Sequence, residues 1–121
     1  MYPQMGVSRF TLTMAYSALT SNDEPANVPG SFALHPAYPN PFNPITNLRY
    51  DLPEQAQVTI RIYDLIGREV THLINTTQEA GYKSVQWNAT DSFGKPVSAG
   101  VYFYQIRTAG FVQTRKMVLL K

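Results

Sequence analysis

The side chains best suited to acid–base or metal chemistry in this sequence are two histidines and a few carboxylates. His35 and His72 lie far apart in the chain, so they do not form a metal-binding pair. Asp51, Asp64 and Glu69 fall at expected strand edges or turns, where solvation and turn capping account for them. The sequence contains no H-E-x-x-H, C-x-x-C or G-x-S-x-G motif and no glycine-rich phosphate loop. We therefore expect no catalytic residues, no cofactor, no metal site and no enzymatic activity.

Asp91 is the one acid that begins a loop with some likeness to a calcium site. The segment Asp91-Ser92-Phe93-Gly94 matches such a loop only at its first residue and lacks the later oxygen ligands at regular spacing. Aspartate also commonly accepts hydrogen bonds from backbone amides two residues ahead, which forms an Asx-turn. The Asx-turn is the better interpretation.

The composition indicates one folded domain with a tail. The chain has 121 residues, of which 44% are hydrophobic and 15% charged. The net charge of +2 is too small to drive binding to nucleic acid by phosphate neutralisation. Cysteine is absent, so stability must come from packing. No apolar run reaches the roughly 18 residues that a membrane span requires.

The chain divides into three parts. Residues 10–16 alternate apolar and polar side chains like a strand, and residues 1–20 are expected to end a preceding domain. This strand could instead pair with an open edge of the domain that follows. Residues 21–36 are rich in turn formers and are expected to be a linker. Residues 37–121 are expected to form the main domain.

Proline dominates the entry to that domain. In the segment from Tyr38 to Pro44, each residue before a proline is disfavoured in the α region, so an extended chain is predicted. Tyr38 and Phe42 are its expected anchors on one end of the core. The alternative is a proline-rich ligand for an SH3-type partner.

From residue 45 onward the sequence reads as short strands without a helical period. Residues 48–52 and 58–63 alternate apolar and polar side chains, whereas Leu73 breaks the alternation of the third strand and predicts a bulge. Trp87 is expected at the centre of the core. Residues 101–107 and 111–121, joined by a turn at residues 108–110, predict a closing hairpin. The expected fold is all-β, an immunoglobulin-like antiparallel β-sandwich of about six to seven strands, with an extra N-terminal strand and a proline-rich linker.

Charge is distributed unevenly along the chain. No acid follows Asp91, while five basic residues do: Lys95, Arg107, Arg115, Lys116 and Lys121. Basic residues on a terminal hairpin can protect an edge strand against aggregation. They can equally form a docking surface for an acidic receptor.

Six separated motifs together resemble a known family. They are Tyr38-Pro39-Asn40-Pro41-Phe42-Asn43-Pro44, Leu48-Arg49-Tyr50-Asp51-Leu52-Pro53, Ile62-Tyr63-Asp64, Gly67-Arg68-Glu69-Val70, Gly100-Val101-Tyr102-Phe103-Tyr104 and Lys116-Met117-Val118-Leu119-Leu120-Lys121. In order and spacing they resemble the C-terminal sorting domain of type IX secretion cargo. The pattern is also similar to the immunoglobulin-like domain of the flagellar hook-capping protein.

The resemblance implies a non-catalytic address domain. It would direct an attached N-terminal cargo through the periplasm and the outer-membrane translocon of a Gram-negative bacterium to the cell surface or medium. A sortase-like peptidase would be a further partner. The implied recognition residues are Gly100, Val101, Tyr102, Lys116, Met117, Val118, Leu119, Leu120 and Lys121. A terminal strand with a free edge would offer main-chain groups for strand addition, and its lysines would steer the encounter.

Two other functions compete with sorting. A structural or assembly module, resembling a hook cap or a surface filament, would use the strand at residues 10–16 to pair with a neighbouring copy. An enzyme would need a concave site with perturbed acids or histidines, for which the sequence offers no candidates.

Overall fold

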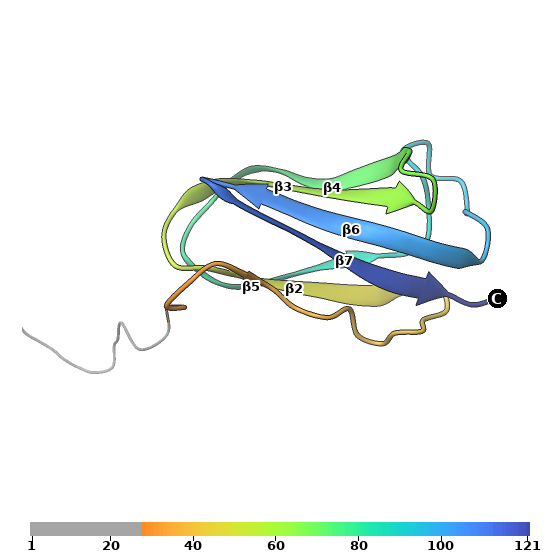
Figure 1. The fold of residues 1–121 in the computed structure, drawn as a ribbon, viewed down its shortest axis with the longest axis horizontal. Helices are drawn as coiled ribbons and strands as arrows, with labels where there is room; N and C mark the ends of the chain where they lie inside the picture. Colours follow the sequence, from red (N-terminus) through yellow and green to blue (C-terminus); the bar gives the residue numbers. More distant parts are fainter. Residues whose placement is uncertain (1–27) are drawn as a thin grey trace, which may run out of the picture.

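The computed structural model describes residues 28–121. The strand expected at residues 10–16 and the first part of the expected linker, residues 21–27, lie outside the described residues. Within the described part the chain is all-β, with seven strands in two antiparallel sheets (Figure 1). The predicted β-sandwich is therefore confirmed.

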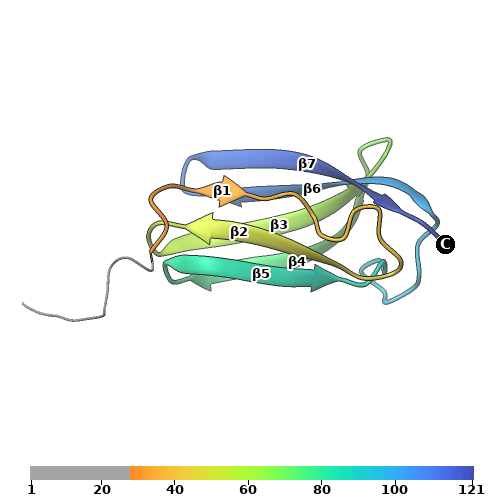
Figure 2. The same ribbon diagram turned by 90° about the horizontal axis from the view of Figure 1, so that it is seen from below.

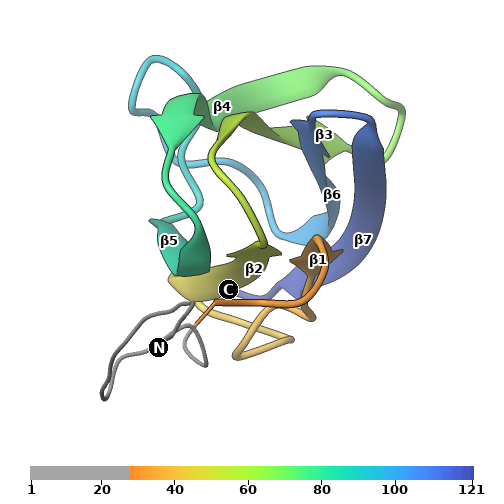
Figure 3. The same cartoon turned by 90° about the vertical axis from the view of Figure 1, so that its left-hand side faces the viewer.

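The strands are β1 (Ala33–Leu34), β2 (Thr46–Leu52), β3 (Ala56–Asp64), β4 (Glu69–Gln78), β5 (Gly81–Trp87), β6 (Gly100–Thr108) and β7 (Phe111–Leu119). One sheet has the order β1-β2-β5 and the other the order β4-β3-β6-β7. Figure 3 shows the two sheets facing one another, with β1 beside β7 on one side and β4 above β5 on the other. Figure 2 shows the three-stranded sheet in front of the four-stranded one.

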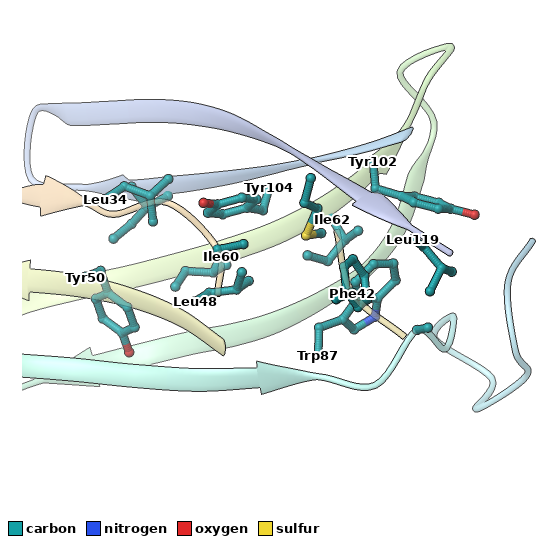
Figure 4. Packing of buried hydrophobic residues seen from close by; sticks show 14 of the residues in the cluster. Leu34, Phe42, Leu48, Tyr50, Ile60, Ile62, Trp87, Tyr102, Tyr104 and Leu119 are labelled. Carbon is teal, nitrogen blue, oxygen red and sulfur yellow. The ribbon is translucent and has the colours of Figure 1, made fainter. Parts of the chain in front are cut away.

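The core lies between the sheets and follows from the alternation in the sequence. In β2, Leu48, Tyr50 and Leu52 point inward, and in β3, Val58, Ile60 and Ile62 do the same. Successive side chains of a strand lie on opposite faces, so every second residue enters the core. Figure 4 shows Leu48 and Tyr50 of β2 and Ile60 and Ile62 of β3 in the space between the two sheets.

The domain begins earlier than residue 37. Ala33 and Leu34 pair with Asp51 and Tyr50 of β2, and Leu34 is buried. The expected linker, which ran to residue 36, therefore includes a strand of the sandwich. A strand of two residues is too short to show the alternation on which the sequence prediction depends.

Of the two expected aromatic anchors, one is confirmed and one is wrong. Phe42 is buried and its ring lies 5.8 Å from that of Trp87. Tyr38 is 72% exposed. The backbone N–H of Tyr38 donates to Asn47 O, and Asn47 N–H donates back to Tyr38 O, at 3.1 and 2.9 Å. The chain at residue 38 is thus fixed by its backbone, while the side chain points into solvent.

β4 contains the predicted bulge. Ile60 pairs with Ile74 and Arg61 with His72, which leaves Leu73 as the extra residue. A second irregularity leaves Val70 unpaired, because Ile62 pairs with Thr71 and Tyr63 with Glu69. A bulge increases the local twist of a strand. β4 is thereby bent, and Val70, Leu73 and Ile74 all pack against the core as half-buried side chains.

Candidate functional site

The two segments named as recognition elements lie side by side in the structure. Gly100, Val101 and Tyr102 begin β6, and they pair with Leu119, Val118 and Met117 near the end of β7. Leu120 and Lys121 follow directly. In Figure 1 this end of the molecule also holds the turn between β3 and β4 and the loop between β5 and β6. We call it the C-terminal end of the sandwich.

Burial divides these nine residues into two groups. Tyr102, Met117 and Leu119 are buried, and Gly100, Val101 and Val118 are half-buried. Lys116, Leu120 and Lys121 are exposed. A partner of the folded domain can therefore touch the exposed residues directly, whereas the buried side chains act by holding the two strands in place.

Tyr102 joins the core to the loop between β5 and β6. Its ring contacts Trp87 edge-on at 5.2 Å between centroids, and its hydroxyl donates to Ser98 O at 2.6 Å. Burial raises the pKa of the Tyr102 phenol, and the negative charge of Asp64 raises it further. The hydrogen bond from this hydroxyl to Ser98 O ties the loop to β6.

The backbone conformation at position 100 requires glycine, although there is room for a side chain. Its φ is +151°, a region that residues with a Cβ rarely adopt, and no atom lies within 4 Å of where a Cβ would be. Any substitution at this position strains the start of β6. Gly100 thus sets the path by which the loop enters the strand.

The edge of β7 is not free at its C-terminal half, so the expected open edge is wrong there. Phe42 N–H donates to Val118 O, and Leu120 N–H donates to Phe42 O, each at 2.9 Å. The side chain of Asn40 accepts from Val118 N–H at 3.0 Å and reaches Lys116 O at 3.4 Å. The main-chain groups expected to receive a partner strand are already bonded.

The same segment covers β7 further along its length. We call residues 32–42 the strap. Gln113 of β7 accepts a hydrogen bond from Leu34 N–H at 3.3 Å, and Arg115 donates to Leu34 O at 2.6 Å. The hydroxyl of Tyr104 in β6 donates to His35 O at 2.7 Å. The strap therefore closes this side of the sandwich by bridging from β2 to β7.

The turn between β3 and β4 is held by one carboxylate. Asp64 Oδ1 accepts from the N–H groups of Ile66 and Arg68 at 3.1 and 2.9 Å, and Asp64 Oδ2 accepts from Arg68 Nε at 2.9 Å. Desolvation alone would raise the pKa of Asp64. The hydrogen bonds and charge of Arg68, with the amide of Ile66, outweigh it and lower the pKa below its usual value. Gly67, with φ of +90°, supplies the left-handed residue of the turn.

Two shallow grooves flank this turn. One has a volume of about 260 Å³ and is bordered by Leu65, Ile66 and the predicted recognition residues Gly100, Val101 and Tyr102. The other, of about 330 Å³, includes Phe93 and Val97 from the loop between β5 and β6. Asp64 and Arg68 border both grooves. Leu65, Ile66 and Phe93 were missed from the sequence, although two large apolar residues directly before the glycine of a turn are a usable signal.

The other groups considered for chemistry have structural partners. Asp91 Oδ1 accepts from the N–H groups of Phe93 and Lys95, at 2.9 and 3.0 Å, which confirms the Asx-turn. His35 Nε2 lies 2.9 Å from Asp51 Oδ2. Within residues 28–121, no three histidine, aspartate or glutamate side chains gather closely enough to hold a metal ion. Nor does this part of the chain contain a helix long and apolar enough to cross a membrane.

The two packed sheets define an immunoglobulin-like β-sandwich domain, and solved structures share this fold. Dimeric latent PorU from Porphyromonas gingivalis matches 74% of the chain with a TM-score of 0.58 and 21% identity. PorZ, described as an essential surface component of the type IX secretion system of the same organism, matches 73% with a TM-score of 0.51 and 22% identity. The chain spans 9% and 11% of those two proteins. FlgD from P. aeruginosa matches over 61% of both chains with a TM-score of 0.51 and 25% identity.

The family is identified by sequence. Residues 36–120 match the secretion system C-terminal sorting domain. The chain belongs to this family and carries a C-terminal sorting signal for type IX secretion. This sorting-signal family is non-catalytic. No curated protein sequence matches the chain significantly.

Proposed function

We propose that this domain is a non-catalytic address that directs an attached N-terminal cargo through the type IX outer-membrane translocon to the cell surface or medium. The observation that carries the proposal is the direct pairing of Gly100, Val101 and Tyr102 with Leu119, Val118 and Met117. The two motifs, one on each strand of the closing hairpin, are thereby brought together at the C-terminal end of the sandwich. Family membership supports the same function.

Recognition by this address would use the folded domain. Tyr102, Met117 and Leu119 contribute to the core, so a receptor that read their side chains would have to unfold the domain. Lys116, Leu120 and Lys121 are exposed and can be read without unfolding. We infer that these three residues contact the translocon, and that a sortase-like peptidase then acts on the exported protein.

The test is export of a reporter in a bacterium with a type IX system. A periplasmic reporter is fused to the N-terminus of the full chain, and the reporter in the medium and on the cell surface is measured. The variant Lys116→Ala/Leu120→Ser/Lys121→Ala should be exported less than wild type at an unchanged unfolding midpoint. A matched control, Thr114→Ala, changes another exposed residue of β7. A wild-type fusion that stays inside the cell would refute the function, and equal export of variant and control would refute the role of these three residues.

An assembly role is the second candidate. β4 and β5 are the outer strands of their sheets on the side away from the strap, and could accept a strand from a neighbouring copy. Part of the β4 edge is used, because Ser92 N–H donates to Val70 O at 3.2 Å. If residues 10–16 pair with a neighbouring copy, sedimentation will give a mass above that of the monomer. Deletion of residues 1–20 will then restore the monomer.

A further inference from the structure

The outer side of the four-stranded sheet faces solvent. In β3, β6 and β7 the buried residues alternate with residues on the opposite side, because successive side chains of a strand point to opposite faces. In Figure 3 no other described part of the chain lies over that side of the sheet. We call the side that carries Arg61, Tyr63, Phe103, Arg107 and Lys116 the outer face.

The formal charge on the outer face is positive. Arg61, Arg107 and Lys116 lie at outward positions of β3, β6 and β7, and no outward position of these three strands holds an acid. Arg107 and Lys116 are exposed, and neither takes part in an ion pair among residues 28–121. Two positive charges on this side of the sheet therefore have no ionic partner within the described domain.

The acids at the ends of the neighbouring strands are already engaged. Glu69 begins β4, and its carboxylate oxygens lie 3.4 Å from Arg61 Nε and 3.9 Å from His72 Nδ1. Asp64 ends β3, follows the alternation of the buried residues and lies 2.9 Å from Arg68 Nε. β6 and β7 contain no acid at all. The charges of Arg107 and Lys116 are therefore not offset from within their own strands.

The sheet spaces its three outward cations regularly. Lys116 pairs with Phe103, Arg61 pairs with Gln105, and Arg107 lies two residues further along β6. Two residues of a strand rise by about 7 Å, so the three rows together span about 14 Å. Arg107 Nε also donates to Gln105 Oε1 at 3.0 Å, which positions the guanidinium before a partner arrives. Ordering a side chain in advance reduces the entropy that binding would otherwise cost.

Apolar side chains lie beside these charges. Tyr63 pairs with Phe103 in the row of Lys116, and Val101 pairs with Val118 in the next row toward the C-terminal end of the sandwich. All four apolar side chains are half-buried. Three cations are few for a nucleic acid, whose affinity grows with the number of phosphates that are neutralised. Cations next to aromatic side chains suit a protein surface that combines carboxylates with apolar residues.

We propose that the outer face docks on a protein partner, and that this partner presents carboxylate side chains to Arg107 and Lys116 beside an apolar area. The inference rests on the proposed function, in which the partner belongs to the secretion machinery. It extends the recognition surface from the terminal residues along β6. A second copy of the chain does not fit, because its outer face carries the same sign of charge.

The first experiment measures export of the full chain with the N-terminal reporter in a type IX host. The test variant is Arg107→Glu, which leaves Lys116, Leu120 and Lys121 intact. The matched control is Arg49→Glu, because Arg49 is also an exposed arginine in a strand but lies in β2 of the other sheet. We expect Arg107→Glu to be exported less than the control at an unchanged unfolding midpoint. Arg107→Gln, which removes the charge without reversing it, should be exported at an intermediate level.

The second experiment measures binding of the purified full chain to nuclease-treated outer-membrane vesicles of the same host. Loss of one hydrogen bond between charged groups changes affinity by about tenfold or more, so Arg107→Glu should bind at least about tenfold more weakly than wild type. Binding of wild type should weaken as salt rises and should be lost after protease treatment of the vesicles. Thr114→Ala changes the outer face without removing a charge and should bind like wild type.

Several results would overturn the inference. One is wild-type export that Arg107→Glu matches, which leaves the proposed function standing. Absence of wild-type binding to the vesicles, or binding that is insensitive to salt, is another. Binding that survives protease treatment would assign the occupant to an anionic lipid or glycan instead of a protein. Retention of the wild-type fusion inside the cell is a different result, because it refutes the proposed function and, with it, this inference.

Discussion

Trp87→Ala should be among the most destabilising single substitutions in this domain. Trp87 is 1% exposed, contacts the rings of Phe42 and Tyr102 at 5.8 and 5.2 Å, and donates from Nε1 to Thr90 O at 2.9 Å. Truncation of a buried tryptophan to alanine costs about 3–5 kcal/mol, because a cavity remains. Each kcal/mol lowers the Tm of a domain of this size by about 4–8 °C.

The effect should reach the strap as well as the core. Phe42 packs on Trp87, and Phe42 O accepts the N–H of Leu120 at 2.9 Å. Loss of the indole therefore loosens the cover of β7, and the amide of Leu120 should exchange with solvent faster than in wild type. Denaturant titration measures the free energy of unfolding. Amide hydrogen exchange at Leu120 measures how firmly the strap is held on β7.

Two controls make the prediction about Trp87 decisive. Trp87→Phe keeps an aromatic ring but loses the hydrogen bond to Thr90, so it should cost less than Trp87→Ala. Lys95→Ala changes an exposed loop side chain and should alter stability by less than about 0.5 kcal/mol. If Trp87→Ala and Lys95→Ala shift the denaturation midpoint equally, Trp87 is not at the centre of the core.

Three further outcomes follow from single contacts. Asn40→Ala removes the acceptor of Val118 N–H and should cost about 1 kcal/mol by denaturant titration, while Asn40→Asp, which keeps that acceptor, should cost less. Because the pKa of Asp64 is lowered by folding, its carboxylate stabilises the fold above the unfolded pKa of about 3.9, and this stability is lost as pH falls through the lower folded pKa. Acid titration of Asp64→Asn should show a weaker loss between those values, and a curve identical to wild type would contradict the role of Asp64. Tyr104→Phe removes the hydrogen bond to His35 O and should cost about 0.5–1.5 kcal/mol in a thermal melt, whereas no loss would show that this contact contributes nothing to stability.

Alternation within single strands made much of the fold predictable. The inward residues of β2 and β3, the burial of Trp87 and the closing hairpin of β6 and β7 follow from patterns that span only a few residues. The bulge at Leu73 was also predictable, because an extra residue shifts the period of two at one point. In each case the signal lies within the segment itself.

The packing of the strap along β7 could not be predicted in this way. It depends on Asn40 and Phe42 reaching residues 116–120, and nothing in either segment specifies that pairing. The strap contains only two residues of strand, and the exposure of Tyr38 follows from its backbone pairing with Asn47. For the candidate site, the motifs predicted a set of recognition residues, which stays a prediction. The structure then separated the buried members of that set from those that a partner can touch.

The contact between the strap and β7 also determines when the fold can be completed. Leu34 is hydrogen-bonded to Gln113 and Arg115, residues 79 and 81 positions later in the chain. Met117 and Leu119 complete the interior. A ribosome makes the strap first and β7 last, and contacts between such distant residues form late in folding. Under the proposed function, a translocon that recognises the folded domain would therefore reject a chain that ends before β7.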